Sequence, residues 1–253
     1  MTETLSEGIG AIPVFRGDLF DGQGEARFAI GVVATGETPT RGRELEYAAY
    51  LTLRANVYAH EMHYIAVDGL NADGTESDGN DARSIHFAVF ENTGEAVRCV
   101  GAMRLILKSG DQPEPLPVER HYPEAFTKGP APLGSAEVSH LIGRHENVRV
   151  QASIKWPLFL SSVTWALRHD IPDAYGVVEE SLERRLLVDR VPLERLAPAK
   201  FVPEFNTVKL PVQVDVAGLD ARLDNVESHL FAALRTVTHQ FVYSGVLPRV
   251  RLT

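Results

Sequence analysis

Apolar runs along the chain predict strands, and apolar residues spaced three and four apart predict helices. The clearest pair of runs is Ile85 to Phe90 and Val100 to Leu107, joined by a short segment containing Asn92-Thr-Gly94. Two apolar runs with a short glycine-containing connection are typical of a β-hairpin. We therefore expect a hairpin near the middle of the chain.

Further runs extend this hairpin into a mixed α/β arrangement. Pro157 falls near the start of one predicted helix, and Ser181 is a candidate N-cap of another. The alternation of strands and helices favours one α/β domain, residues 1–253, with a mixed sheet. The expected strands are residues 28–35, 135–143, 174–179 and one or two within 201–216; the expected helices are 44–64, 156–170, 182–188 and 219–243; an irregular N-terminal arm covers 1–25, and the C-terminal helix falls within 217–245.

The connection from Ser109 to Pro132 contains six prolines. Because proline removes a backbone donor and fixes φ, we expect little regular structure there. Connections of this length often cover functional sites.

Composition narrows the classes of function. The chain has a net charge of −9, which disfavours nucleic-acid binding through a basic face. Its single cysteine, Cys99, excludes an internal disulfide and is expected to be a small core residue. No apolar run is long enough for a membrane span, and the first residues lack a signal-peptide pattern, so we expect a cytoplasmic protein.

Charged residues gather around the hairpin. Glu76, Asp78 and Asp81 precede its first strand, and Arg104 lies inside its second, where a charge is costly unless it is paired. A guanidinium can hold a carboxylate through two hydrogen bonds. The partner of Arg104 is either the acidic loop, which we favour, or the carboxylate of a bound acceptor. Arg54 is a third candidate member of this network.

Other motifs predict no further chemistry. His60 and His63 are three residues apart, whereas the zinc helix motif needs a spacing of four, and we expect no metal and no tightly bound cofactor. Asp78 and Asp81 have an alternative role as N-cap or turn residues, and Arg54 as a solvated helix residue. A solvated helix face is the expected role of four further arginines, Arg184, Arg185, Arg190 and Arg195.

Four short motifs occur in a fixed order. They are Arg54 with Tyr58, Glu76-x-Asp78-x-x-Asp81, Gly101-x-x-Arg104-Leu and Glu137-Val-Ser139. In this order they resemble the autoinducer-synthase branch of the GNAT acyltransferases, and within it the N-acyl amino acid synthases and exosortase-system-associated acyltransferases. The resemblance extends over roughly residues 28–190. It implies a GNAT-like twisted mixed sheet, flanked by helices, whose central strands splay around an acyl thioester.

The resemblance also implies site residues, with departures. The positions that match the family's functional residues are Arg54, Asp78, Asp81, Arg104 and Glu137. His140 stands where the family has arginine, and Tyr64 stands where autoinducer synthases carry a tryptophan used around S-adenosylmethionine. Residues 143–151 replace the common pyrophosphate-binding loop, which favours acyl carrier protein over acyl-CoA as the donor.

Glu137 is our candidate general base, because a positioned carboxylate can take the proton of an attacking amine. Its alternative role is a surface strand residue paired with an arginine. The apolar strands and the helix 156–170 line either an acyl chamber or a plain core. The expected substrate-binding residues are Ser139, His140, Tyr58, Tyr64 and Trp165; the expected carrier-docking residues are Arg144, Arg149, Lys155 and Arg168, which are otherwise solvated.

The sequence thus predicts an N-acyltransferase that moves a fatty acyl group from a carrier thioester to the amine of a small acceptor, such as an amino acid. One alternative is an acyl-homoserine-lactone synthase that uses S-adenosylmethionine. The other is a non-catalytic acyl-binding module, because a fold does not fix a function.

Overall fold

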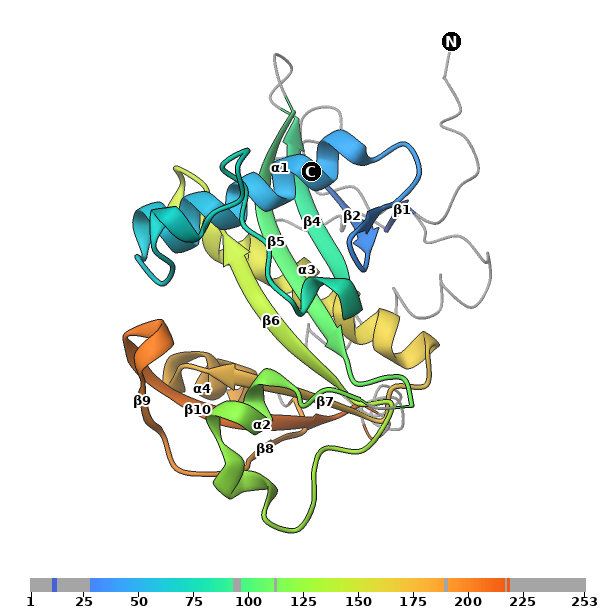
Figure 1. Cartoon of the computed structure of the whole chain (residues 1–253), viewed down its shortest axis with the longest axis vertical. Coiled ribbons are helices and arrows are strands. Elements are labelled where there is room, and N and C mark those ends of the chain that lie inside the picture. The colour runs from blue at the N-terminus through green and yellow to red at the C-terminus, as the bar shows by residue number, and fades with distance from the viewer. Residues whose placement is uncertain are drawn as a thin grey trace.

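The computed structural model of the chain describes residues 11–12, 28–92, 97–111, 113–188, 191–216 and 218 (Figure 1). The strands are β1 Ala11–Ile12, β2 Phe28–Thr35, β3 Thr38–Pro39, β4 Ser84–Asn92, β5 Val97–Leu107, β6 Ala136–Gly143, β7 Asp173–Val178, β8 Leu193–Arg195, β9 Lys200–Val202 and β10 Thr207–Asp215. The α-helices are α1 Glu44–Ala55, α2 Pro117–His121, α3 Val148–Arg168 and α4 Glu180–Val188. A π-helical turn, Asn56–Glu61, follows α1, and 3-10 turns span Val67–Gly69, Asp81–Arg83, Pro123–Phe126 and Pro203–Phe205.

The described strands form a twisted sheet in the order β1-β2-β4-β5-β6-β7-β10-β8, with β3 on β2 and β9 on β10. The predicted hairpin is β4 and β5. The one parallel pair among the described strands is β6 with β7, and it spans three residues, Ala136–Val138 against Ala174–Gly176. Beyond this pairing the two strands diverge, as Figure 1 shows. The predicted mixed sheet with splayed central strands is confirmed.

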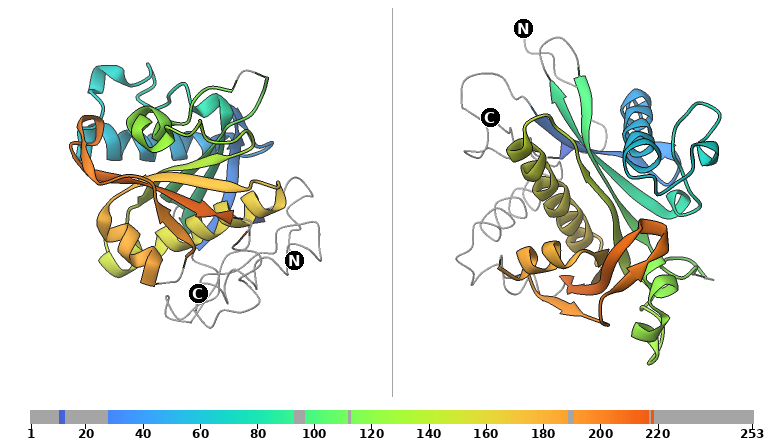
Figure 2. Two further views of the ribbon diagram at one scale, coloured as in Figure 1. Left: turned by 90° about the horizontal axis from the view of Figure 1, so that it is seen from below. Right: turned by 90° about the vertical axis from the view of Figure 1, so that its left-hand side faces the viewer.

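Helices cover both faces of the sheet, with α1 on one side and α3 on the other (Figure 2, right). Successive strand residues point to opposite faces. Phe87 accordingly packs in the core under α3, with Leu158, whereas the next residue, Ala88, packs under α1 with Tyr50. The sheet therefore separates two apolar cores, and any passage between them must open where β6 leaves β7.

Two predicted helices have different bounds in the structure. The helix expected over 44–64 changes to a π-helical turn at Asn56, and this turn ends at Glu61. Two residues later the backbone of His63 is left-handed, with a φ of 54°. The helix expected from residue 156 begins at Val148, so that Pro157 lies inside it. An interior proline costs about 3 kcal/mol, but Pro157 is buried in the tightly packed face of α3, and this packing offsets the lost hydrogen bond.

The prediction of little regular structure between Ser109 and Pro132 is wrong, because α2 and a 3-10 turn form there. Each begins with a proline, a position at which the missing N–H has no helical partner to lose. The carboxylate of Glu119 accepts a hydrogen bond from the Leu116 backbone N–H at 2.6 Å and pairs with the buried Lys108 ammonium at 2.7 Å. These contacts fix α2 against the sheet.

Smaller differences concern α4 and the chain ends. Ser181 is the second residue of α4 and not its N-cap. Arg195 was expected on a solvated helix face, but it lies on β8 and pairs with Glu183 of α4. The N-terminal arm apart from β1, the C-terminal helix apart from Gly218, and Arg190 lie outside the described residues.

Within the described part of the chain, none of the helices has the length and apolar character that crossing a bilayer requires.

The close approach of α3 to the sheet gives a first prediction. A Cβ added to Gly101 of β5 would lie 2.5 Å from Cγ2 of Ile154, whose branched side chain has little rotamer freedom in a helix. We expect Gly101→Ala to lower the free energy of unfolding by about 1–3 kcal/mol through overpacking. Gly79→Ala, where a Cβ meets nothing within 4 Å, is the matched control. Equal chemical-denaturation midpoints for the two variants would contradict this account of the contact.

Candidate active site

A buried network of ions lies between α1 and the sheet. Arg54 of α1 and Arg104 of β5 are 0% and 2% exposed, and both donate hydrogen bonds to the same oxygen, Oδ1 of the fully buried Asp81, at 2.7 Å. Arg54 also donates to Glu76 through Nε. Burying two guanidiniums is costly unless each is paired and hydrogen-bonded. The acidic loop supplies those partners, so the alternative of Arg54 as a solvated helix residue is wrong.

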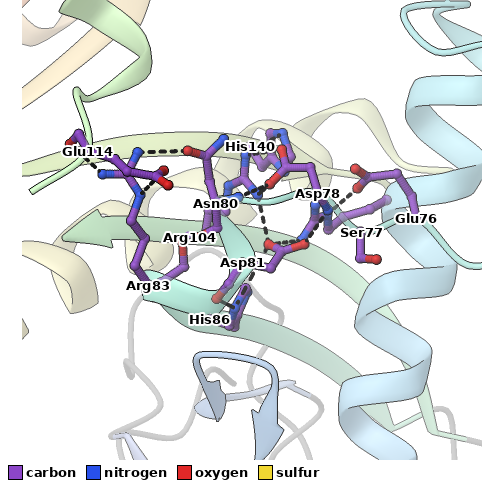
Figure 3. Close-up of polar contacts among 12 residues, drawn as sticks. Glu76, Ser77, Asp78, Asn80, Asp81, Arg83, His86, Arg104, Glu114 and His140 are labelled. Carbon is purple, nitrogen blue, oxygen red and sulfur yellow. Dashed lines mark hydrogen bonds and ion pairs between the residues drawn. The ribbon is translucent and has the colours of Figure 1, made fainter. Parts of the chain in front are cut away.

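Arg104 is held by the loop from a second direction. Its two terminal nitrogens bind the two carboxylate oxygens of Asp78 at 2.6 and 2.7 Å (Figure 3). Burial alone would raise the pKa of Asp78, but the hydrogen bonds and charge of Arg104 outweigh burial and lower it to about 2. Both terminal nitrogens of Arg104 are thus bound by the acidic loop, which is the pairing that we favoured over an acceptor carboxylate.

The loop is also folded by its own acids. The backbone N–H of Asp78 donates to Asp81 at 2.8 Å, and the N–H of Asn80 donates to Asp78 at 2.8 Å. Asp78 and Asp81 are therefore turn residues and members of the ion network at once. A loop that is closed by the same carboxylates that bind the arginines has one preferred conformation.

His86 and Tyr50 complete the network and were not predicted. His86 of β4 lies 3.1 Å from the hydroxyl of Tyr50 through Nδ1, and 3.4 Å from the carbonyl of Asp81 through Nε2. Burial lowers the pKa of His86 to about 4, so its ring is neutral at physiological pH. The sequence did contain a signal, because a lone histidine between Ile85 and Phe87 interrupts an apolar strand and requires polar partners.

A cavity of about 690 Å³ occupies the gap between the diverging strands β6 and β7. Trp156 and Phe159 of α3 contribute to one side of its lining, and Tyr64 and Phe205 contribute to the other. Seven of the predicted site residues line it: Tyr58, Tyr64, Glu137, Ser139, His140, Arg144 and Lys155. The cavity therefore reaches both faces of the sheet and borders the ion network at His140.

Glu137 lies on the wall of this cavity. It is 3% exposed, so the alternative role of a surface strand residue is wrong. Its Oε2 accepts a hydrogen bond from the backbone N–H of Val118 in α2 at 2.7 Å. Burial raises the pKa of Glu137 to about 7, and the Val118 N–H and the charge of Arg104 oppose the rise. A carboxyl group with this pKa can exchange a proton near neutral pH.

The strand that carries Glu137 has a β-bulge at His140. Ala102 pairs with Ile142 and Arg104 pairs with Ser139, so that two residues of β6, His140 and Leu141, oppose one residue of β5. His140 has a φ of 58°, a left-handed conformation that is uncommon for histidine. The bulge breaks the expected alternation along β6 and removes backbone groups from the ladder at the place where the strands splay.

The expected carrier-docking residues do not share one surface. Arg144 and Lys155 line the cavity, and Arg144 also pairs with Glu61 at 2.6 Å. Arg168 is exposed at the other end of α3, ~20 Å along the helix from Lys155. The side chain of Arg149 lies outside the described ones.

Two further basic residues line the cavity: Arg185, which is exposed as expected for a solvated helix face but also borders the cavity, and Lys209, which was not predicted. The guanidinium of Arg185 lies 5.7 Å from the ring centre of Trp156.

Trp165, which we expected to bind substrate, does not line the cavity; its ring stacks on His169 at 3.9 Å. Among the described side chains, no group of three or more His, Cys, Asp or Glu residues is arranged to hold a metal ion.

Several solved structures share the fold of this chain. The AHL synthase LasI is similar over 76% of this chain and 91% of its own, with 16% identity and a TM-score of 0.56. The CoA-dependent acyl-homoserine lactone synthase BjaI, solved with SAM and isopentyl-CoA, is similar over 84% and 100%, with 16% identity and a TM-score of 0.57.

FeeM, an N-acyl amino acid synthase from uncultured soil microbes, is similar over 76% of this chain and 92% of its own, with 17% identity and a TM-score of 0.50. No protein-family model matches the sequence, and no curated protein matches it. Identities this low show a shared fold, and the predicted resemblance is confirmed at that level.

The ion network gives a second prediction. We expect Asp81→Ala and Arg104→Ala each to lower the free energy of unfolding by about 3–5 kcal/mol, because each leaves a buried charge without its partner. In the double variant that shared penalty is counted once, so its loss should be smaller than the sum by about 0.5–3 kcal/mol.

The control pairs Asp81→Ala with Glu124→Ala, since Glu124 bonds Lys200 at the surface and shares no partner with Asp81. Here the losses should add within about 0.5 kcal/mol. Additive losses in the Asp81 and Arg104 cycle, measured by chemical denaturation, would show that these two residues do not act together.

Proposed function

We propose that the protein is an N-acyltransferase that moves a fatty acyl group from a carrier thioester to the amine of a small acceptor, with an amino acid as the favoured acceptor. The observation that carries the proposal is the cavity in the gap between β6 and β7, with the buried carboxyl of Glu137 on its wall. Such a cavity can hold a long, mostly apolar chain whose reactive end lies next to a group that exchanges protons near neutral pH.

In the proposed reaction the nitrogen lone pair of the acceptor attacks the thioester carbonyl carbon. A free α-amine has a pKa of about 8 and is largely protonated at neutral pH. Glu137, as carboxylate, takes a proton from the amine directly or through a water, an effect typically worth about 10²–10⁴-fold. The carbonyl oxygen becomes an oxyanion, which hydrogen-bond donors at the bulge in β6 stabilise. The C–S bond then breaks, the thiolate leaves with a proton, and the amide is released.

The similar structures support acyl transfer. They include AHL synthases, one of them with isopentyl-CoA, and an N-acyl amino acid synthase. The competing function is an acyl-homoserine-lactone synthase acting on S-adenosylmethionine, which the structure of BjaI with SAM favours. Tyr64 favours the amino-acid acceptor, because it replaces the tryptophan that autoinducer synthases use around S-adenosylmethionine.

A competition assay separates these functions. Purified protein is given an acyl thioester with a mixture of the amino acids and S-adenosylmethionine, and the products are identified by mass spectrometry. An N-acyl amino acid supports the proposal, whereas an acyl-homoserine lactone together with methylthioadenosine supports the competitor. Absence of any acylated product with both CoA and carrier-protein donors would indicate the non-catalytic binding module.

The third prediction concerns Glu137. With saturating substrates, kcat should rise with pH through about 7 as Glu137 ionises, because only its carboxylate can accept the proton. Glu137→Gln should keep the fold, lower kcat by at least about tenfold and remove this rise. Glu61→Gln, a carboxyl in an exposed pair, is the control. If the Gln variant retains both the rate and the pH dependence of the wild type, Glu137 is not the base.

The donor gives the fourth prediction. We favour acyl carrier protein, because the usual pyrophosphate loop is missing and because Arg144 and Lys155 line the cavity. The chain itself carries a net charge of −9, so a local basic surface must offset repulsion of an acidic carrier. Such attraction is screened over roughly 8–10 Å at physiological salt.

The test compares acyl carrier protein and acyl-CoA of one chain length at low and high salt. The carrier should give the higher kcat/KM and should lose it as salt rises. Lys155→Glu should lower kcat/KM for the carrier, whereas Arg168→Glu, on the same helix but ~20 Å away, should have a smaller effect. Equal use of the two donors without salt dependence would contradict delivery by the carrier protein.

A further inference from the structure

Among the described residues, His140 is the one that belongs to both the ion network and the cavity lining. It lines the cavity, and its Nε2 lies 3.4 Å from Nη2 of Arg104. Its other ring nitrogen, Nδ1, is buried and has no hydrogen-bond partner within the described protein. A buried polar atom without a partner is costly, which calls for a reason.

The surroundings of His140 fix its tautomer. Arg104 is a donor only, so Nε2 of His140 must be the acceptor in their contact. Burial, together with the charges of Arg104 and Arg54, holds the pKa of His140 well below its usual range, so the ring is neutral. In a neutral imidazole with an accepting Nε2, the proton is on Nδ1. The unpartnered atom is therefore an N–H donor.

We propose that His140 is a further catalytic residue, whose Nδ1–H donates a hydrogen bond to the carbonyl oxygen of the acyl thioester and to the oxyanion formed from it. This inference rests on the proposed acyl transfer. During the step the nitrogen of the acceptor forms the new C–N bond, the π electrons of the carbonyl move onto its oxygen, and His140 keeps its proton. When the carbonyl re-forms, the electron pair of the C–S bond leaves with the thiolate.

Several contacts prepare His140 for this role before substrate arrives. Arg104 is clamped by both oxygens of Asp78 and by Asp81, so the group that orients His140 cannot swing away. The ring of Tyr58 packs against the imidazole with centroids 4.6 Å apart. The left-handed backbone of the bulge is a strained conformation of the kind that is retained at functional sites. A donor oriented in this way costs little reorganisation when charge develops on the substrate.

The same geometry assigns the proton transfer to another group. Nδ1 of His140 already holds a proton, and Nε2 faces a guanidinium, so neither nitrogen can accept the proton of the amine. Glu137, three residues earlier on β6, has a carboxyl on the cavity wall and a pKa of about 7. A base and a neutral electrophilic donor thus lie on one strand, a division of roles known from other enzymes.

Two substitutions at His140 separate the functions of its nitrogens. The side-chain amide of asparagine places an N–H near the position of Nδ1 and tolerates a left-handed backbone, whereas glutamine places its amide near Nε2. We expect His140→Gln to lower kcat by about 10²–10³-fold, the usual effect of removing one oxyanion donor. His140→Asn should be at least about tenfold faster than His140→Gln for the same reason. His169→Gln, an exposed histidine of the hinge after α3, should match the wild type.

A purely structural role predicts another result. In that case kcat would follow the loss of folded protein, the Asn variant would gain nothing over Gln, and denaturation midpoints would account for both. The pH dependence of kcat adds a second readout, because the rise through about 7 should persist in His140→Gln if Glu137 is the base. Loss of that rise in His140→Gln would identify His140 as the base and overturn the proposal.

Ring ¹⁵N NMR tests the tautomer without turnover. We expect the resonance that disappears in His140→Gln to report a neutral Nδ1–H ring between about pH 5 and pH 8, the range in which free histidine titrates. Adding an acyl-pantetheine ketone, with CH₂ in place of sulfur, should shift this N–H. An Nε2–H ring, an imidazolium or an unchanged Nδ1–H resonance with bound ketone would overturn the proposal.

If the wild type transfers acyl groups and His140→Gln is equally fast, this inference alone fails; if the wild type transfers none, the proposed function fails with it.

Discussion

One carboxylate, that of Asp81, is held between two buried guanidiniums, and the arrangement of the site depends on it. It joins α1 to β5 through charges that neither element could bury alone. The network contains three acids and two arginines. Burial raises the pKa of Glu76, and the charge and hydrogen bond of Arg54 oppose this rise. Removing Asp81 would leave the cations of α1 and β5 facing each other across an apolar interior.

Much of the fold followed from sequence because strands and hairpins follow local patterns. The run from Phe28 to Thr35 is a strand with the predicted bounds, and the central hairpin has the predicted pairing. The start of α3 did not follow, because a proline at residue 157 suggests a beginning and only tertiary packing reveals that the helix continues through it. Local propensity is overridden where the buried face of a helix is long.

The site was partly predictable for a related reason. A charge inside an apolar strand requires a partner, which made Arg104 and the acidic loop recognisable together. The bulge at His140 was not recognisable, because period-two alternation assumes an unbroken ladder and an inserted residue leaves no compositional trace. The spread of Lys155 and Arg168 could have been predicted, because their spacing along one helix already separates them by ~20 Å.

The cavity has a consequence for the order of events. Residues from the α1 side and from the α3 side of the sheet line it, so in the proposed acyl transfer the two substrates can approach the gap from opposite sides. A protein built in this way has no need to store the acyl group on itself between two half-reactions. Its single cysteine, whose thiol pKa is raised by burial to about 12, lies on β5 and does not line the cavity. In the proposed acyl transfer, the splay of β6 from β7 is thus a geometric reason for a ternary complex, in which the sheet would hold the donor and acceptor apart until their reactive atoms meet in the gap.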